Sequence, residues 1–466
     1  MTVDASAPVD TRVEKSPPPV SAARGRLAGL ACAAIIVAAT FFAYRPILKN
    51  GFISLDDQVT VYQNPKLIHL SAITLWSFWG SPEAAIYAPM TYTVFAGVAC
   101  ISRTRVENGR MPDFQFFPGP FHAVSLGLHI VCGLLVYGLL RRLLGRRWPA
   151  LAGALLFALH PMQVESVAWV SETGQVLCGM FSLAALWLYL MSLPSSSDDL
   201  QGPPRRQRRA YFALATELYL MAMAAKPLGV IVPLLAATLH WLVLPGLPRS
   251  GRRWAIPWKL LIWLALAVPF AIVARKAQPV PQWWLKVPLW ERPMVAADAL
   301  CFYLAKIFYP SPLVADYDHS PRVIFRDGWV YETWILPAII ALLIVRLAWQ
   351  KRMRPVVAGS MWFVAALLPV LGFTLFAYQA MSTVADRYIY LPMFGIALAG
   401  AWGLDRLLAR TRRKSVRALI VIATLVLLGV LGVRTRIQTH YWHDSKILFD
   451  RNVALIGREP GTKGGP

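Results

Sequence analysis

The most regular feature of the chain is a series of long apolar runs separated by short polar or basic turns. The first run, 27–44, is apolar on all sides of a helix, whereas a soluble helix keeps one polar face. Helices of roughly 20 apolar residues cross a hydrocarbon core of about 30 Å. The pattern predicts eleven membrane-spanning helices, at 27–48, 121–141, 149–168, 175–193, 210–226, 228–245, 256–274, 331–349, 355–377, 386–404 and 416–434.

Two long loops, 49–120 and 275–330, join these spans on one side of the membrane, which we call the outer side. Within them, 67–80, 87–102 and 283–290 combine tryptophan or other aromatic residues with apolar spacing, but are too short to cross comfortably. Such segments are typical of helices that lie in the membrane interface. The predicted fold class is therefore an all-α polytopic membrane protein, with a bundle of about eleven transmembrane helices and interfacial helices in two long outer loops.

The segment 296–313 is ambiguous, because it is almost long enough to cross the membrane. If it crossed, the basic turn 350–354 would change sides and the alternation of charge would break. We expect this segment to lie in the membrane plane or to re-enter.

Composition and charge support this topology. The chain has 466 residues, of which 57% are hydrophobic and only 15% charged, values typical of membrane proteins. The net charge of +23 is concentrated at every second turn, as the positive-inside rule requires. The N-terminus is thus predicted to be cytoplasmic and the C-terminus periplasmic, in a bacterial inner membrane. The basic excess is mostly an orientation signal, so we predict membrane lipid but no nucleic acid as a partner, and specific lipid binding through these clusters is the minor alternative.

The chain divides into three parts. Residues 1–26 are polar and are predicted to form a disordered cytoplasmic N-terminus, 27–436 form the transmembrane domain, and 437–466 form a short outer tail. The five cysteines lie in apolar stretches and form no CxxC pair, which indicates buried thiols rather than disulfides or metal ligands.

The acid pair Asp56 and Asp57 follows the first span, in a loop between Gly51 and Pro65. A carboxylate at the membrane surface accepts a proton from an incoming hydroxyl, or holds a divalent cation with the help of water. A solvated turn is the alternative. The residues alone do not decide which aspartate acts, or whether a metal is needed.

Further polar residues fall on the same outer side. His160 precedes Pro161, which should bend the third span, and Glu165 follows at the outer surface. Polar groups at this depth are costly unless they have partners, which favours a functional role. Lys226 and Arg387 are cations that the positive-inside rule does not explain, and both suit a phosphate group. The alternatives are an interhelical hydrogen bond for His160, and snorkelling or pairing with Asp386 for the cations.

Several motifs carry a resemblance to a known family. These motifs, in chain order, are FISLDDQVTVYQNPKL, LHPMQVESVAWVSETGQVLCGMF, AKPLGVIVPLL, FYPSPLVADYDH, ADRYIYLPMFGIAL and YWHDSKILF. They resemble the membrane part of the transmembrane and tetratricopeptide-repeat O-mannosyltransferases and their bacterial relatives, which belong to the GT-C glycosyltransferase superfamily. The most specific pieces are HPxxxESVAWVSE and DRYxYLP.

The resemblance implies an enzyme that takes a sugar from a polyprenyl-phosphate carrier at the outer face. An acid in the first outer loop acts as the base in that superfamily, which corresponds here to Asp56 or Asp57. We predict that Arg387 and Lys226 hold the phosphate, while His160 and Glu165 shape or polarise the site. A single displacement inverts the anomeric centre, and no metal is required by the sequence. The sugar is not predicted, and the acceptor is a protein or a glycan.

Two departures from the family pattern keep other functions open. The tetratricopeptide repeats that usually follow the last span are absent, and 437–466 is expected to form only a remnant of a first repeat helix. Many relatives also have an arginine where Ala88 stands. A non-catalytic membrane anchor or assembly protein is therefore one alternative. A lipid or solute transporter is another, although the spans carry little mid-bilayer charge apart from Glu217.

Overall fold

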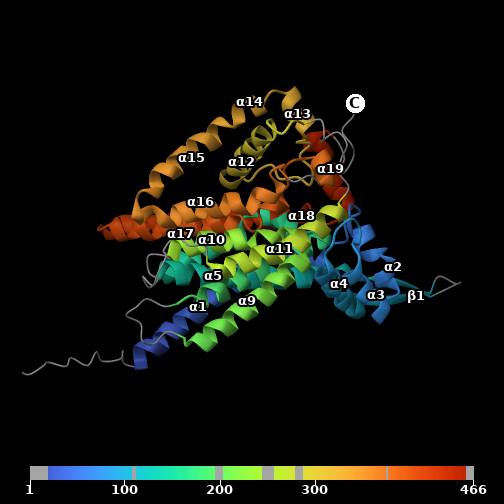
Figure 1. The fold of residues 1–466 in the computed structure, drawn as a ribbon, viewed down its shortest axis with the longest axis horizontal. Helices are drawn as coiled ribbons and strands as arrows, with labels where there is room; N and C mark the ends of the chain where they lie inside the picture. Colours follow the sequence, from blue (N-terminus) through green and yellow to red (C-terminus); the bar gives the residue numbers. More distant parts are fainter. Residues whose placement is uncertain are drawn as a thin grey trace, which may run out of the picture.

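A computed structural model describes residues 19–107, 112–194, 203–243, 257–278, 287–373 and 376–457. Helices dominate the structure (Figure 1). The α-helices are α1 (Pro19–Tyr44), α2 (Pro65–Ile68), α3 (Ala72–Gly80), α4 (Pro89–Ser102), α5 (Pro118–Leu144), α6 (Arg147–Leu159), α7 (Val164–Ala168), α8 (Thr173–Met191), α9 (Arg205–Ala225), α10 (Val232–Val243), α11 (Trp258–Ala277), α12 (Arg292–Phe308), α13 (Pro321–Arg326), α14 (Val330–Thr333), α15 (Ile335–Ala348), α16 (Arg354–Leu367), α17 (Met393–Arg410), α18 (Lys414–His440) and α19 (Ser445–Ile456). Short 3-10 or π turns connect several of them.

The polytopic character predicted from the sequence is confirmed. Among the described residues, seven helices are long and apolar enough to cross a membrane, or eight if the bent pair Arg147–Leu159 and Pro161–Ala168 is one span. The predicted spans 210–226, 228–245 and 386–404 coincide with α9, α10 and α17, which are helical but do not meet that length and composition. The number of eleven spans therefore stays a prediction.

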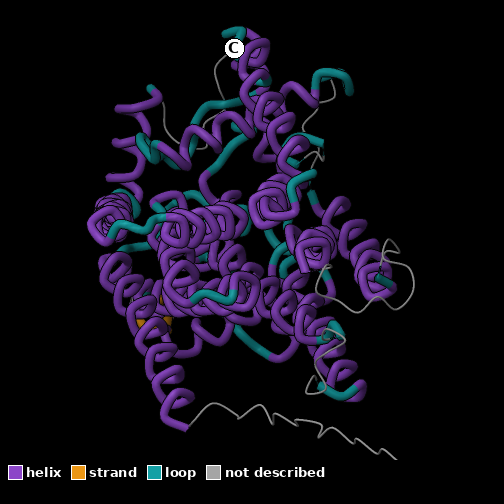
Figure 2. The backbone as a smooth tube through the Cα atoms, turned by 90° about the vertical axis from the view of Figure 1, so that its left-hand side faces the viewer, coloured by secondary structure: helices purple, strands orange, loops and turns teal. Residues whose placement is uncertain are grey.

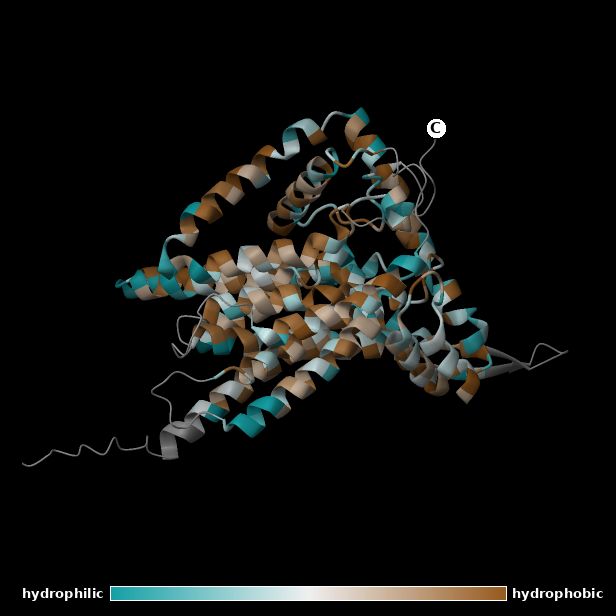
Figure 3. Ribbon diagram, viewed as in Figure 1, coloured by the Kyte–Doolittle hydropathy of each residue, from teal (hydrophilic) through white to brown (hydrophobic). Residues whose placement is uncertain are grey.

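The long helices lie side by side in one bundle. Many of them are seen nearly end-on when the molecule is turned by 90° (Figure 2). The elements of the first outer loop, α2, α3, α4 and β1, gather at one end of the bundle, and α19 lies on the same side (Figure 1). The hydrophilic start of α9 and the turn between α17 and α18 lie at the other end (Figure 3). The acid-bearing loop and these two basic segments are thus at opposite ends.

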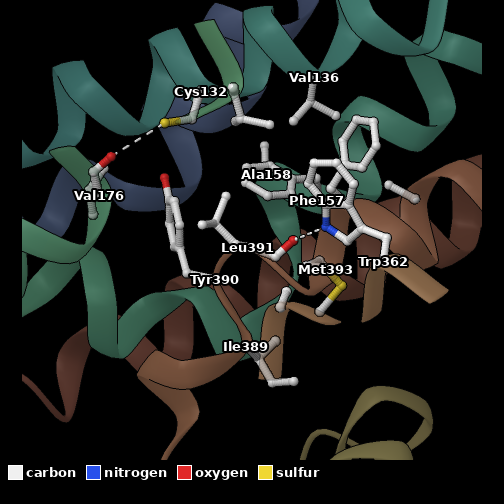
Figure 4. Packing of buried hydrophobic residues seen from close by; sticks show 14 of the residues in the cluster. Cys132, Val136, Phe157, Ala158, Val176, Trp362, Ile389, Tyr390, Leu391 and Met393 are labelled. Atoms are coloured by element: carbon white, nitrogen blue, oxygen red, sulfur yellow. Dashed lines mark hydrogen bonds between the residues drawn. The ribbon is translucent and has the colours of Figure 1, made fainter. Parts of the chain in front are cut away.

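The core of the bundle is packed closely enough to require small residues. An added Cβ at Gly359 of α16 would lie 2.5 Å from the carbonyl oxygen of Gly395 of α17, so the two helix backbones are in direct contact. Next to this contact, Trp362 donates a hydrogen bond of 2.8 Å to the Leu391 carbonyl, and the Cys132 thiol faces the Val176 carbonyl (Figure 4). This packing anchors the DRYIYLP segment that leads into α17.

Some local predictions need correction. The first outer loop contains a two-stranded antiparallel hairpin, β1 (Arg103–Glu107) and β2 (Pro112–Phe116), although only helices were expected. The helix predicted at 67–80 is two helices, because Ser71 caps a new helix: its hydroxyl accepts from the Thr74 N–H, and its own N–H donates to the Thr74 hydroxyl. Of the five free cysteines, Cys32, Cys132 and Cys178 are buried, whereas Cys100 is exposed.

The two ends of the chain also differ in part from the expectation. Helix α1 begins at Pro19, inside the terminus predicted to be disordered at 1–26, because proline is well suited to the first turn of a helix. The rest of that terminus, 1–18, lies outside the described residues. At the other end, α19 coincides with the predicted repeat-like helix.

In the second outer loop, the aromatic segment 283–290 lies mostly outside the described residues. The ambiguous segment 296–313 corresponds to α12, which at 17 residues is shorter than the helices counted as spans. Its position relative to the membrane plane stays a prediction.

Candidate active site

The first outer loop is held in place by the turn that follows α18. The side chain of Asn50 donates a hydrogen bond of 2.8 Å to the Trp442 carbonyl, and the Gly51 N–H donates one of 2.8 Å to the His443 carbonyl. The Ser54 N–H then reaches the hydroxyl of Ser445 at 2.8 Å. The YWHDS motif, 441–445, therefore fixes the loop that carries the acid pair.

Asp57 is fully buried, and both of its carboxylate oxygens accept hydrogen bonds. Oδ2 accepts from the Ile53 N–H at 2.8 Å, while Oδ1 accepts from the N–H of Ser171 at 2.8 Å and from its hydroxyl at 2.5 Å. Burial raises the pKa of Asp57 to about 6, an effect that the Ser171 and Ile53 bonds oppose and the neighbouring Asp56 charge reinforces. Asp57 thus ties the first loop to the turn at 170–172.

Asp56 has different surroundings, although it is the adjacent residue. It is exposed, so its carboxylate can meet a substrate. The protein atoms around it nevertheless remove enough hydration to raise the pKa of Asp56. The charges of Arg387 and Lys226 lower this pKa and that of Glu172 raises it, which places Asp56 within electrostatic reach of all three.

Those three charges belong to a connected network of two cations and two carboxylates. The Lys226 ammonium pairs with Glu172, the Arg387 Nε lies 3.5 Å from Glu172, and a second guanidinium nitrogen pairs with Glu165. Glu165 also accepts a hydrogen bond of 3.1 Å from the Arg387 backbone N–H. Predicted site residues from three separate segments are therefore brought together, but neither cation is free. Asp386, predicted as an alternative partner of Arg387, instead accepts a hydrogen bond of 2.9 Å from the Tyr317 hydroxyl.

Local chain geometry positions both cations. Lys226 precedes Pro227, a sequence that favours an extended backbone, and α9 ends at Ala225 as a result. The Arg387 guanidinium lies 4.1 Å from the centroid of the Tyr378 ring, and the rings of Tyr388 and Trp169 are at 5.0 and 5.5 Å. Cation–π contacts of this kind stabilise a guanidinium withdrawn from water. Of the two side chains, Lys226 is the more accessible, at 16% exposed against 7% for Arg387.

His160 does not provide a free ring nitrogen. Its Nδ1 accepts a hydrogen bond of 3.3 Å from the Met162 N–H, and its Nε2 lies 3.0 Å from the Ile307 carbonyl oxygen, to which it donates. The ring is therefore neutral and caps the chain where α6 ends, at the 52° bend before Pro161–Ala168. The expectation that His160 shapes the site is compatible with this position, but both ring nitrogens are already engaged with backbone groups, so the ring has none left to polarise a substrate.

The side chains of the candidate site also bear on whether it could bind a metal ion. Among the described residues, no group of three or more His, Cys, Asp or Glu side chains is arranged to hold a metal ion. A divalent cation shared by both aspartates would have to share the Asp57 carboxylate oxygens with the hydrogen bonds from Ile53 and Ser171. Asp56 is the member of the pair whose carboxylate is exposed.

Ser171 and Tyr378 contribute to this arrangement without having been predicted from the sequence. Ser171 lies in the ESVAWVSE motif, so its place in that motif was a usable signal. Tyr378 lies in an apolar stretch with no distinguishing pattern, and only the fold brings its ring to Arg387.

Comparison with known proteins places this geometry in context. No known family profile matches the chain. The human protein O-mannosyl-transferase TMTC1 is 24% identical over 481 aligned positions, which cover 92% of this chain and 52% of that protein. The protein O-mannosyl-transferase F38B6.6 of Caenorhabditis elegans is 22% identical, with coverages of 86% and 55%. The chain thus spans about half the length of these curated relatives.

Among solved structures, the oligosaccharyltransferase of Archaeoglobus fulgidus in the apo form has a TM-score of 0.50 at 14% sequence identity. The match covers 94% of this chain and 61% of that one. In fold the chain resembles this archaeal enzyme, a GT-C glycosyltransferase, and in sequence it is similar to the TMTC O-mannosyltransferases. The predicted GT-C-like fold and the predicted family resemblance are both confirmed. The same archaeal enzyme has been solved with an inhibitory peptide and a dolichol-phosphate.

Proposed function

We propose that the chain is an inverting membrane glycosyltransferase of the GT-C type, which transfers a sugar from a polyprenyl-phosphate donor to an acceptor hydroxyl. The observation that carries the proposal is the position of Asp56. It is the exposed member of the acid pair, and it lies within electrostatic reach of the cations Arg387 and Lys226. A proton acceptor and groups suited to an anionic leaving group thus belong to one site.

In the proposed reaction the acceptor hydroxyl attacks the anomeric carbon, and Asp56 takes its proton. The bond from that carbon to the phosphate oxygen breaks, and the lipid phosphate leaves as an anion. Lys226 and Arg387, oriented by Glu172 and Glu165, stabilise the negative charge on this phosphate. One displacement inverts the anomeric centre, and a phosphate leaving group needs little help from an acid. Asp57 positions the loop through its hydrogen bonds from Ser171, and Asp56 acts as the base.

The proposed topology follows from the two ends of the bundle. The basic start of α9 and the basic turn before α18 lie opposite the first outer loop. The positive-inside rule therefore favours a cytoplasmic N-terminus and a periplasmic Asp56, in a bacterial inner membrane. A polyprenyl tail buried in the outer leaflet would present the phosphate-linked sugar at the level of this loop. The acceptor is a hydroxyl of a protein or a glycan.

The test uses the purified full chain and a panel of labelled polyprenyl-phosphate sugars, mannose among them, with peptide, glycan and lipid acceptors. The Asp56→Asn and Asp57→Asn variants are compared with wild type. Asp450→Asn is the matched control, because Asp450 is likewise an exposed aspartate at the outer end, but it pairs with Lys446 on the surface of α19. Transfer that persists at full rate in both Asp56→Asn and Asp57→Asn would refute the assignment of the base. Absence of both transfer and donor binding would favour the alternative function, a non-catalytic membrane anchor or assembly protein.

A further inference from the structure

A cavity lies away from the acid pair, towards the C-terminal end of α5. It has a volume of about 640 Å³ and lies between α1, α5 and α8. Ala33 and Leu134 supply an apolar wall, Tyr137 and Trp187 an aromatic one, and Arg141 and Arg142 the charge. The first outer loop joins the opposite, N-terminal end of α5, so this cavity does not belong to the proposed active site.

The two arginines of this cavity lack the carboxylate partners that Arg387 and Lys226 have. Arg141 donates a hydrogen bond of 2.5 Å to the Gly145 carbonyl, and Arg142 donates one of 3.2 Å to the Leu190 carbonyl. Within the described part of the chain, neither arginine forms an ion pair with an acid. Carbonyl groups orient the guanidinium groups without neutralising them, so two fixed positive charges stand beside an apolar wall.

The walls of the cavity suit an acyl chain. The Trp187 indole ring packs against α5 at Gly138, where an added Cβ would come within 1.8 Å of the ring. Ala33 and Leu134 leave the remaining space lined by hydrocarbon. Tryptophan and tyrosine near basic residues at the end of membrane helices are typical of the depth of the lipid head groups. All three helices that form the cavity, α1, α5 and α8, belong to segments able to cross a membrane.

We propose that this cavity binds an anionic phospholipid, with its phosphate between Arg141 and Arg142 and an acyl chain along Ala33 and Leu134. A basic recess between transmembrane helices is suited to such a head group. The apolar wall favours a lipid over a free phosphate ion, which would gain nothing from it. The cavity is separate from the donor site, so the proposal does not depend on the glycosyltransferase activity.

The test is native mass spectrometry of the purified full chain after incubation with phosphatidylglycerol or phosphatidylcholine. Wild type should retain phosphatidylglycerol, and the double variant Arg141→Gln/Arg142→Gln should retain it less by on the order of tenfold, since each cation near an anionic lipid contributes to binding. The matched control is Arg412→Gln/Arg413→Gln, which removes the same charge from an exposed turn before α18 that lines neither this cavity nor the site. Ala33→Trp keeps both arginines and fills the apolar wall, and it should also weaken retention.

Each result bears on the proposal. An equal loss in the Arg412/Arg413 control would mean that bulk surface charge attracts the lipid, which overturns the assigned site. Displacement of the lipid by excess inorganic phosphate, or full retention by Ala33→Trp, would refute the proposal that the apolar wall binds an acyl chain. The melting temperature of every variant is measured alongside, so that lost binding is compared only among folded proteins.

Discussion

Oδ1 of Asp57 accepts two hydrogen bonds from Ser171, one from the backbone N–H at 2.8 Å and one from the hydroxyl at 2.5 Å. This contact joins the first outer loop to the turn that carries Glu172, the residue that pairs with Lys226 and lies beside Arg387. The position of the loop and the position of the cations are therefore set by the same three-residue turn. The two aspartates therefore differ in role: Asp57 holds the loop in place, whereas the exposed Asp56 is open to substrate.

The first prediction separates the two aspartates. Asp56→Asn should lower the transfer rate about 10²- to 10⁴-fold, the usual contribution of a general base, while the melting temperature stays near that of wild type because Asp56 is exposed. Asp57→Asn should lower the melting temperature as well as the rate, since an amide cannot accept from both Ile53 and Ser171. Activity assays and thermal unfolding in detergent distinguish these patterns. A stable Asp57→Asn protein and an unstable Asp56→Asn protein would reverse the assignment.

The second prediction concerns the pH dependence of transfer. The base must be ionised, and because the pKa of Asp56 is raised, the rate should fall with decreasing pH at a higher pH than for an ordinary aspartate. The Lys226 charge lowers this pKa, so Lys226→Met should move the acidic limb to still higher pH. Rate profiles of wild type and variant under saturating donor test the shift. If the limb stays in place while the rate drops, Lys226 contributes only to phosphate binding.

The third prediction concerns stability and Asp57. Its pKa is raised from 3.8 to about 6 in the folded protein, so the folded state retains a proton that the unfolded state has lost between these values. Stability should therefore fall as pH rises through this window, by on the order of 3 kcal/mol for two pKa units. Asp57→Asn removes this dependence, and its deficit relative to wild type should be smaller at pH 7 than at pH 4.5. A deficit that is the same at both pH values would contradict the prediction.

The fourth prediction concerns the buried ion pair. Glu165→Ala leaves the Arg387 guanidinium buried with one carboxylate fewer, which should cost about 3–5 kcal/mol of stability. Asp405→Ala is the matched control, because Asp405 lies 3.9 Å from an Arg146 side chain that is largely exposed. Its loss should cost about 1 kcal/mol or less. Chemical unfolding followed by tryptophan fluorescence compares the two, and equal costs would argue against a structural role for the Glu165 pair.

The fifth prediction concerns His160. Its ring nitrogens are engaged with Met162 and Ile307, so His160→Ala should lower the melting temperature without moving the pH profile of transfer. Trp148→Ala, an exposed substitution at the start of α6, is the control for general effects on that helix. A displaced pH profile in His160→Ala would restore a polarising role to this histidine.

The sequence was sufficient for the helical membrane fold. Most of the apolar runs are long enough to determine their own helical state, because a backbone in hydrocarbon must satisfy its hydrogen bonds within the helix. Departures are local and have local causes, such as the Ser71 cap that divides 67–80 into two helices. The acid pair, Lys226 and Arg387 were also recognisable, since charged residues at the outer ends of apolar runs are conspicuous.

The roles within the site depended on the tertiary structure. Asp56 and Asp57 are adjacent and chemically identical, and it is the contact with Ser171, 114 residues later, that joins the buried carboxylate to a distant turn while the other stays open. Likewise the pairing of Arg387 with Glu165 spans 222 residues, whereas the sequence offered the neighbouring Asp386 as an alternative partner. The sequence by itself determined which segments enter the membrane, because that depends on hydrophobicity along a single helix. The function of each charge was decided by packing between helices, because desolvation and pairing depend on neighbours that are distant in the chain.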